Sequence, residues 1–284
     1  MRVRVVTDSS TNVPDSYLER LGIVEIPAIV NFGTQSFRNK IDISTEEFYR
    51  RLATADRLPT TAQPTPQQFA DAYAQLAAEG AEEVIAVCVS GRMSGTLNSA
   101  TIAGGQAPIV VHPWDSQSAS VGAAWQAIAA AEMAQEGLSS AVILSRLAGI
   151  RARIQTITTP ATLRHLVASG RVPRLQGNIG DLLDIKPLLS MVHGLLEPVG
   201  QARGRRRALA EMIHRIAAAV GDRPVRAGLA HANVLEEAAK FLENVRARLN
   251  AVETFITDIG PTLTALAGPG IIALAAYTVE EDNS

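Results

Sequence analysis

Apolar runs of strand length alternate with stretches of helical spacing over the first half of the chain. The most continuous run, residues 83–89, is typical of a parallel strand that is covered on both faces. Further strand-like runs lie at residues 3–6, 24–32 and 107–112, and helical stretches at 13–18, 66–79, 98–103, 121–136 and 139–153. This alternation predicts a parallel sheet with helices on both faces over residues 1–155.

Three residues give local signals that position these elements. Ser44, with Glu47 three residues later, predicts a helix start, and Thr65 followed by Pro66 predicts another. Pro27 lies inside the run 24–32 and predicts an edge strand or a bulge, because proline has no N–H to donate to a neighbouring strand.

Four loops rich in Ser, Thr, Asp and Gln interrupt the first half, at residues 7–12, 60–68, 90–96 and 113–120. Ligands bind at the carboxyl ends of parallel strands, and a helix N-terminus can hold an anion there. Ser94 and Thr96 would add hydroxyl donors. Two simpler roles stay open. Ser94 could serve as a helix cap without binding a ligand, and Asp8 could hydrogen-bond the backbone of its own loop without binding a ligand.

The second half has a different, mixed pattern. Residues 190–199 predict a hairpin that turns near His193-Gly194. Strands are predicted at 225–231, 253–257 and 271–278, and helices at 160–166, 208–220 and 234–249. We therefore expect an α/β protein of two domains, an N-terminal domain at 1–155 and a mixed C-terminal domain at 156–284, with a ligand between them.

Composition and charge exclude several classes of protein. Hydrophobic residues make up 47% of the chain and aromatic residues 4%, which predicts a globular protein with an aliphatic core. The net charge of −2 argues against a general nucleic-acid binder. The single cysteine, Cys88, lies in the most apolar strand and is expected to be inert. Neither a signal peptide nor a membrane-spanning run is recognisable, so we expect a cytoplasmic protein without integral membrane association.

The sequence contains no recognisable catalytic or metal-binding motif. The histidines have no metal-ligand spacing, and no phosphate-binding loop or nucleophile elbow is present, so we expect no metal, no cofactor and no catalytic residue. His231 is the best-placed titratable residue of the second half. Four arginines in five positions, Arg203, Arg205, Arg206 and Arg207, instead predict a docking surface for an acidic partner.

These residues together resemble the bacterial DegV family, the fatty-acid-binding (FakB-type) subunits of fatty acid kinase. The resemblance runs nearly end to end. It rests on Val6-Thr7-Asp8-Ser9-Ser10, Thr61-Ala62-Gln63-Pro64-Thr65-Pro66, Ser94-Gly95-Thr96-Leu97-Asn98-Ser99-Ala100, Asp115-Ser116-Gln117-Ser118-Ala119-Ser120-Val121-Gly122, Gly170-Arg171-Val172, Gly177-Asn178, Lys186-Pro187, Arg203-Gly204-Arg205 and Gly268-Pro269-Gly270.

The resemblance implies an acyl chain buried between two α/β domains, with Thr61 and Ser94 as carboxylate-binding hydroxyls and Arg171 as the arginine of a family motif. The ligand-binding residues it implies are Thr61, Gln63, Ser94, Gly95, Thr96, Ser118, Arg171, Leu266 and Gly268. Leu266 departs from the family, which has a histidine there, and Ala62 replaces a family serine.

We therefore expect a protein that binds a long-chain fatty acid in an interdomain tunnel. It would present the carboxylate to a separate ATP-dependent kinase that docks on the arginines. An alternative is an enzyme that uses Asp8, Ser94 and His231 on a small acidic or phosphorylated substrate. An RNA-binding module is a third hypothesis, and the few aromatic residues and the negative charge disfavour it.

Overall fold

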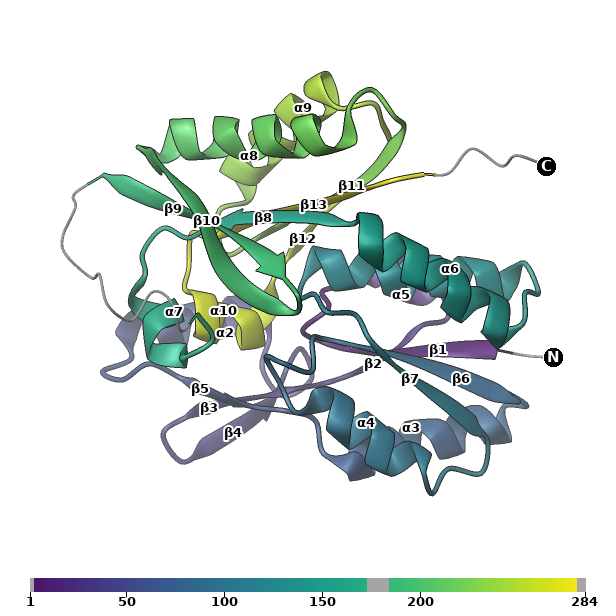
Figure 1. Cartoon of the computed structure of the whole chain (residues 1–284). Coiled ribbons are helices and arrows are strands. Elements are labelled where there is room, and N and C mark those ends of the chain that lie inside the picture. Colours follow the sequence, from purple (N-terminus) through teal and green to yellow (C-terminus); the bar gives the residue numbers. More distant parts are fainter. Residues whose placement is uncertain (1–2, 173–183, 280–284) are drawn as a thin grey trace.

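A parallel sheet forms the centre of the N-terminal half, as predicted. The computed structural model describes residues 3–172 and 184–279. The strands, in spatial order, are β2 (Val24–Ile26), β1 (Val3–Asp8), β6 (Glu83–Cys88) and β7 (Val110–Asp115) (Figure 1). β6 is central, and Val84 to Cys88 are fully buried. The predicted end of β7 is wrong: the strand runs on through Pro113, which an edge strand tolerates.

Helices cover both faces of this sheet. The outer face carries α3 (Pro66–Ala78) and α4 (Thr96–Gly104), and the inner face carries α1 (Asp15–Leu21), α5 (Val121–Gln135) and α6 (Ser140–Arg153). The predicted start of α3 is confirmed, because the Thr65 hydroxyl accepts a hydrogen bond from the Gln68 N–H and the Gln68 side chain accepts one from the Thr65 N–H.

The second sheet belongs to the C-terminal half and is mixed. Its order is β10 (Leu195–Arg203), β9 (Ile185–Val192), β8 (Gln155–Thr159), β13 (Ile272–Thr278), β11 (Val225–His231) and β12 (Ala251–Asp258), and β11 and β12 are parallel. The predicted hairpin is confirmed: His193 and Gly194 have φ angles of 48° and 80°. The helices α8 (Arg205–Val220) and α9 (Leu235–Arg248) cover the outer face.

Helix α5 lies between the two sheets and packs against strands of both (Figure 1). Its residues 121–131 are all buried, so the helix lacks a polar face. Trp125 packs against Phe255 of β12 and Tyr277 of β13, at ring-centroid distances of 4.7 and 5.8 Å. The division into domains at residue 155 stays a prediction, since one hydrophobic cluster contains residues from both halves.

A third, antiparallel sheet of β4 (Gln35–Arg38), β3 (Ile29–Phe32) and β5 (Thr60–Ala62) was not predicted. The single strand expected at 24–32 is wrong: it breaks at Pro27-Ala28, and its two parts join different sheets. The helices α2 (Thr45–Thr54), α7 (Arg164–Ser169) and α10 (Gly260–Ala267) lie at this end of the molecule. The Ser44 cap of α2 is confirmed, whereas α10 was not predicted.

Candidate functional site

The loops that follow β1, β6 and β7 are held together by hydrogen bonds at the carboxyl ends of these strands. The Asp8 carboxylate accepts from the N–H of Ser10 at 2.9 Å and of Val89 at 2.8 Å. The N–H of Ser90 donates to the Ser118 carbonyl, and that of Ser120 to the Ser10 carbonyl. Burial raises the pKa of the Asp8 carboxyl, which these backbone bonds partly oppose. Asp8 therefore braces the loops.

These loops form one wall of a cavity of about 370 Å³, which we call the polar cavity. The opposite wall comes from β5 and α10. Its polar lining residues are Ser10, Thr61, Gln63, Ser94, Thr96, Arg171 and Thr262, and Gly95 and Ala62 also line it. Seven of the nine residues expected from the sequence to bind a ligand thus lie around one space: Thr61, Gln63, Ser94, Gly95, Thr96, Arg171 and Leu266.

A second cavity, of about 100 Å³, is almost entirely apolar, and we call it the apolar cavity. Its walls come from β8, β9, β13, the start of α5 and α10. The residues that line both cavities are Met93, Ala119, Arg171, Leu263 and Leu266. The two cavities therefore adjoin, and together they form a site with one polar end and one apolar end.

The electrostatics of the polar cavity favour an anion. Gly95 and Thr96 form the N-terminus of α4, and Thr262 lies in the first turn of α10, so two helix N-termini contribute partial positive charge. Arg171 adds a full positive charge, and its Nη1 donates to the Ser169 carbonyl. The described residues that line this cavity include no carboxylate. A carboxylate or phosphate head group would find donors there without a competing negative charge.

Local packing fixes the Ser94 loop. The Ser94 and Thr96 hydroxyl oxygens are 2.8 Å apart, and the Ser94 hydroxyl accepts from the Thr96 N–H at 3.3 Å. Ser94 thus supports the start of α4 and also lines the cavity. The Gln63 amide donates to the Ser99 hydroxyl at 3.1 Å and crosses Gly95, where a Cβ atom would lie 2.1 Å from Gln63 Oε1. A larger residue at position 95 would therefore displace the Gln63 amide from this place.

Two residues in the expected ligand set, Ser118 and Gly268, line neither cavity. Ser118 is 1% exposed, and its carbonyl accepts the hydrogen bond that joins two of the loops. Gly268 has a φ of +84° and packs against the ring of His165, so it shapes the end of α10. Leu266 does line both cavities and places an apolar side chain at their junction.

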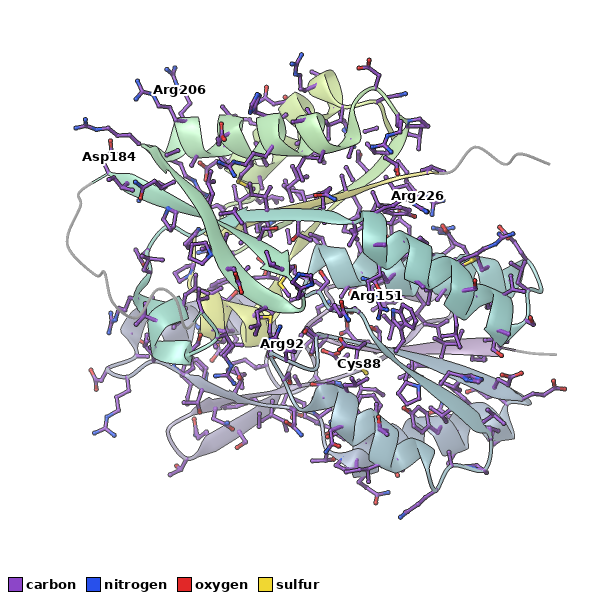
Figure 2. All side chains as sticks on the ribbon, viewed as in Figure 1. Cys88, Arg92, Arg151, Asp184, Arg206 and Arg226 are labelled. Carbon is purple, nitrogen blue, oxygen red and sulfur yellow. The ribbon has the colours of Figure 1, made fainter. Side chains whose placement is uncertain are left out.

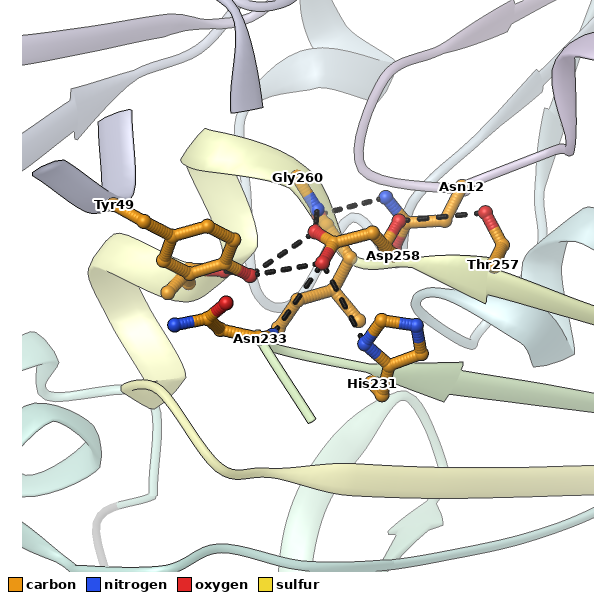
Figure 3. A network of polar contacts seen from close by, with 9 residues as sticks. Asn12, Tyr49, His231, Asn233, Thr257, Asp258 and Gly260 are labelled. Atoms are coloured by element: carbon orange, nitrogen blue, oxygen red, sulfur yellow. Dashed lines mark hydrogen bonds and ion pairs between the residues drawn. The ribbon is translucent and has the colours of Figure 1, made fainter. Parts of the chain in front are cut away.

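The three residues of the alternative enzyme hypothesis, Asp8, Ser94 and His231, do not line a common cavity. Ser94 lines the polar cavity, whereas Asp8 and His231 line neither cavity. His231 Nδ1 lies 3.5 Å from Asp258 Oδ2 in a network at the ends of β11 and β12, where the Tyr49 hydroxyl and the Gly260 N–H also donate to Asp258 (Figure 3). Burial lowers the pKa of His231, and the Asp258 carboxylate acts in the opposite direction. This network joins α2 to the start of α10.

Sequence reasoning missed several residues that line the cavities. Ser10 lies in a polar loop that was recognised, but the hydroxyl nearest the site could not be chosen from the pattern alone. Thr262 gave no signal, because α10 was not predicted. The apolar lining residues, such as Ala273 and Leu274 of β13, read as ordinary strand residues.

The predicted arginine surface needs a correction at Arg205. Its guanidinium pairs with Glu237 at 2.9 and 3.0 Å and donates to the carbonyls of Thr159 and Gly270. Arg205 therefore ties α8 to its neighbours. Arg203, Arg206 and Arg207 are exposed, and Figure 2 shows Arg206 pointing away from the start of α8. The Gly177-Asn178 motif lies outside the described residues.

Comparison with known proteins agrees with this architecture. A family model described as "Uncharacterised protein, DegV family" matches residues 2–279. The chain belongs to the DegV family. A DegV domain-containing protein of Halalkalibacterium halodurans is 31% identical over 278 residues, which cover 97% of this chain and 98% of the relative.

Solved structures of other DegV family members have the same fold. A DegV family protein from Thermus thermophilus, described by its fatty acid binding, is 31% identical, with a TM-score of 0.91 over 98% of this chain and 100% of the other. A DegV lipid-binding protein from Thermotoga maritima is 27% identical, with a TM-score of 0.91 over 99% of this chain and 100% of the other. Within the described residues, no helix is long and apolar enough to span a membrane.

Proposed function

We propose that this DegV family member binds a long-chain fatty acid, with the carboxylate in the polar cavity and the tail in the apolar cavity. The observation that carries the proposal is the junction of the two cavities at Leu263, Leu266 and Arg171. An amphiphile with one anionic end matches this division of polar and apolar walls. The fatty acid binding described for the relative from Thermus thermophilus supports the same ligand class.

The tail would supply most of the binding free energy. Burying about 14 methylenes gains roughly 11 kcal/mol before ordering costs, at about 0.8 kcal/mol each. The side chains that line the apolar cavity include two that can adapt to the shape of the tail. Met93 and Met191 both line this cavity, and their unbranched side chains change shape readily.

A separate ATP-dependent kinase would then phosphorylate the bound carboxylate. The sequence contains no phosphate-binding loop of its own for ATP. The polar cavity offers donors and positive charge for the carboxylate, and the exposed arginines at the start of α8 offer a surface for an acidic partner. This role belongs in the cytoplasm, where ATP and the kinase are available.

Native mass spectrometry of the purified full chain tests the ligand class directly. We expect a bound mass of a single fatty acid that is released on denaturation and identified after extraction. A chain that carries no lipid, and that binds no added palmitate or oleate, would contradict the proposal.

The head-group contact at residue 266 gives a further prediction. Leu266 donates no hydrogen bond, so Leu266→His should add a donor at the junction of the cavities. A hydrogen bond to a charged group contributes about 1.5 to 3 kcal/mol, so preference for palmitate over hexadecanol should rise roughly 10- to 150-fold. Calorimetric titration with both ligands measures this ratio.

The control is Leu235→His, on the solvent side of α9, where the leucine is 58% exposed. It should leave the ratio of the two affinities at the wild-type value. An unchanged or smaller ratio in Leu266→His would mean that residue 266 does not face the head group.

A further inference from the structure

We propose that Thr262 is a specificity-determining residue that donates its hydroxyl to the anionic head group, an inference that rests on the proposed function. Thr262 lines the polar cavity and is 4% exposed. Its Oγ1 is buried and has no hydrogen-bond partner among the described residues. Buried hydroxyls in folded proteins are nearly always paired, so an unpaired one beside a cavity indicates that its partner enters with the ligand.

The backbone at Thr262 is fixed while its hydroxyl is free. The Thr262 N–H donates to the Asn39 side-chain oxygen at 3.3 Å, which anchors the first turn of α10. Threonine in a helix has two favourable χ1 rotamers. Turning from one to the other can move Oγ1 toward the cavity, and because Oγ1 holds no hydrogen bond, the change breaks none.

Thr262 lies on α10 next to Leu266, a position whose side chain cannot donate a hydrogen bond to a head group. Thr262 and Leu266 are four residues apart, so they lie on the same face of the helix, and both line the polar cavity. Leu266 offers no polar atom, and Thr262 is the polar side chain of α10 that lines this cavity. The head group would then be held from the loop wall by Ser94 and from the opposite wall by Thr61 and Thr262.

A second threonine on the same helix provides a matched control. Thr264 is fully buried like Thr262, but its Oγ1 lies 3.2 Å from the Tyr49 hydroxyl and it lines neither cavity. The two side chains are identical and belong to one short helix. They differ in whether the hydroxyl already has a partner in the protein and in which side of α10 it occupies.

The test compares the full-length wild type with Thr262→Val and Thr264→Val. The measured quantity is the ratio of the dissociation constants for hexadecanol and palmitate at pH 8, where the carboxylate is ionised. We expect Thr262→Val to reduce this ratio about 10-fold or more, mainly through weaker palmitate binding. Thr262→Ser, which keeps the hydroxyl, should restore it. Thr264→Val should lower the melting temperature and keep the wild-type ratio.

The outcomes separate this inference from the proposed function. If all the variants bind palmitate and Thr262→Val keeps the wild-type ratio, Thr262 does not bind the head group, and the fatty-acid site itself stands. If the wild type binds neither ligand, the proposed function fails. Should Thr262→Val fold poorly, Thr262→Ala provides the same comparison, and a wild-type ratio in that variant also overturns the inference.

Discussion

Ala273→Phe is expected to abolish binding of a long acyl chain. Ala273 belongs to β13, is half-buried and lines the apolar cavity but not the polar cavity. A phenyl ring at this position would fill much of a space of about 100 Å³. Excluding about five methylenes from the cavity would cost roughly 4 kcal/mol, or about 1,000-fold in affinity.

Fluorescent fatty-acid displacement and thermal unfolding would measure the effect on binding and on the fold. The control is Val252→Phe, which places the same ring on the edge strand β12 at a side chain that is 59% exposed. It should bind fatty acid like the wild type. Wild-type affinity in Ala273→Phe would place the tail in another part of the molecule.

Reversing the charge at Arg203, Arg206 and Arg207 is expected to stop phosphorylation of the bound fatty acid and to leave lipid binding intact. All three arginines are exposed and line neither cavity. They make no ion pair with another described residue, so a partner can use their full charge. Glutamate at all three positions would replace attraction for an acidic kinase surface by repulsion.

If a fatty acid kinase acts on the bound lipid as proposed, acyl-phosphate formation with ATP and a purified bacterial fatty acid kinase measures this effect, and we expect a loss of about 100-fold or more. In the wild type the rate should fall as salt is added, because exposed charges are screened. Arg205→Ala is a separate case: it should lower the melting temperature, because it removes the ion pair with Glu237. If the triple variant is phosphorylated at the wild-type rate, the kinase docks on a different surface. If it no longer binds lipid, the arginines belong to the ligand site.

The sequence was most informative where the signal is local. The buried parallel strands, the caps at Ser44 and Thr65 and the hairpin at Gly194 are each encoded within a few neighbouring residues, and the structure confirms them. The polar end of the site was predictable for the same reason. Each hydroxyl loop follows a recognisable strand or precedes a recognisable helix, and parallel strands bring such loops to one edge.

The remaining features depend on contacts between distant segments. The third sheet escaped prediction because β5 has only three residues and lies in a proline-rich stretch. Helix α10 begins with Gly260-Pro261 and is followed by Gly268-Pro269, and both pairs read as turns. The apolar cavity forms where β8 and β13 face α5, and no local pattern encodes that pairing. The role of Arg205 depended on Glu237, which lies 32 residues away in the chain.

The burial of α5 has a consequence for how the protein can be divided. Strands from early and late parts of the chain cover opposite sides of this helix, and Trp125 contacts aromatic rings contributed by the C-terminal sheet. A fragment that ended near residue 155 would expose that side of α5 to water, and the remaining fragment would lose the surface on which its sheet rests. The two halves are therefore not interchangeable modules, and the chain should unfold as a single cooperative unit.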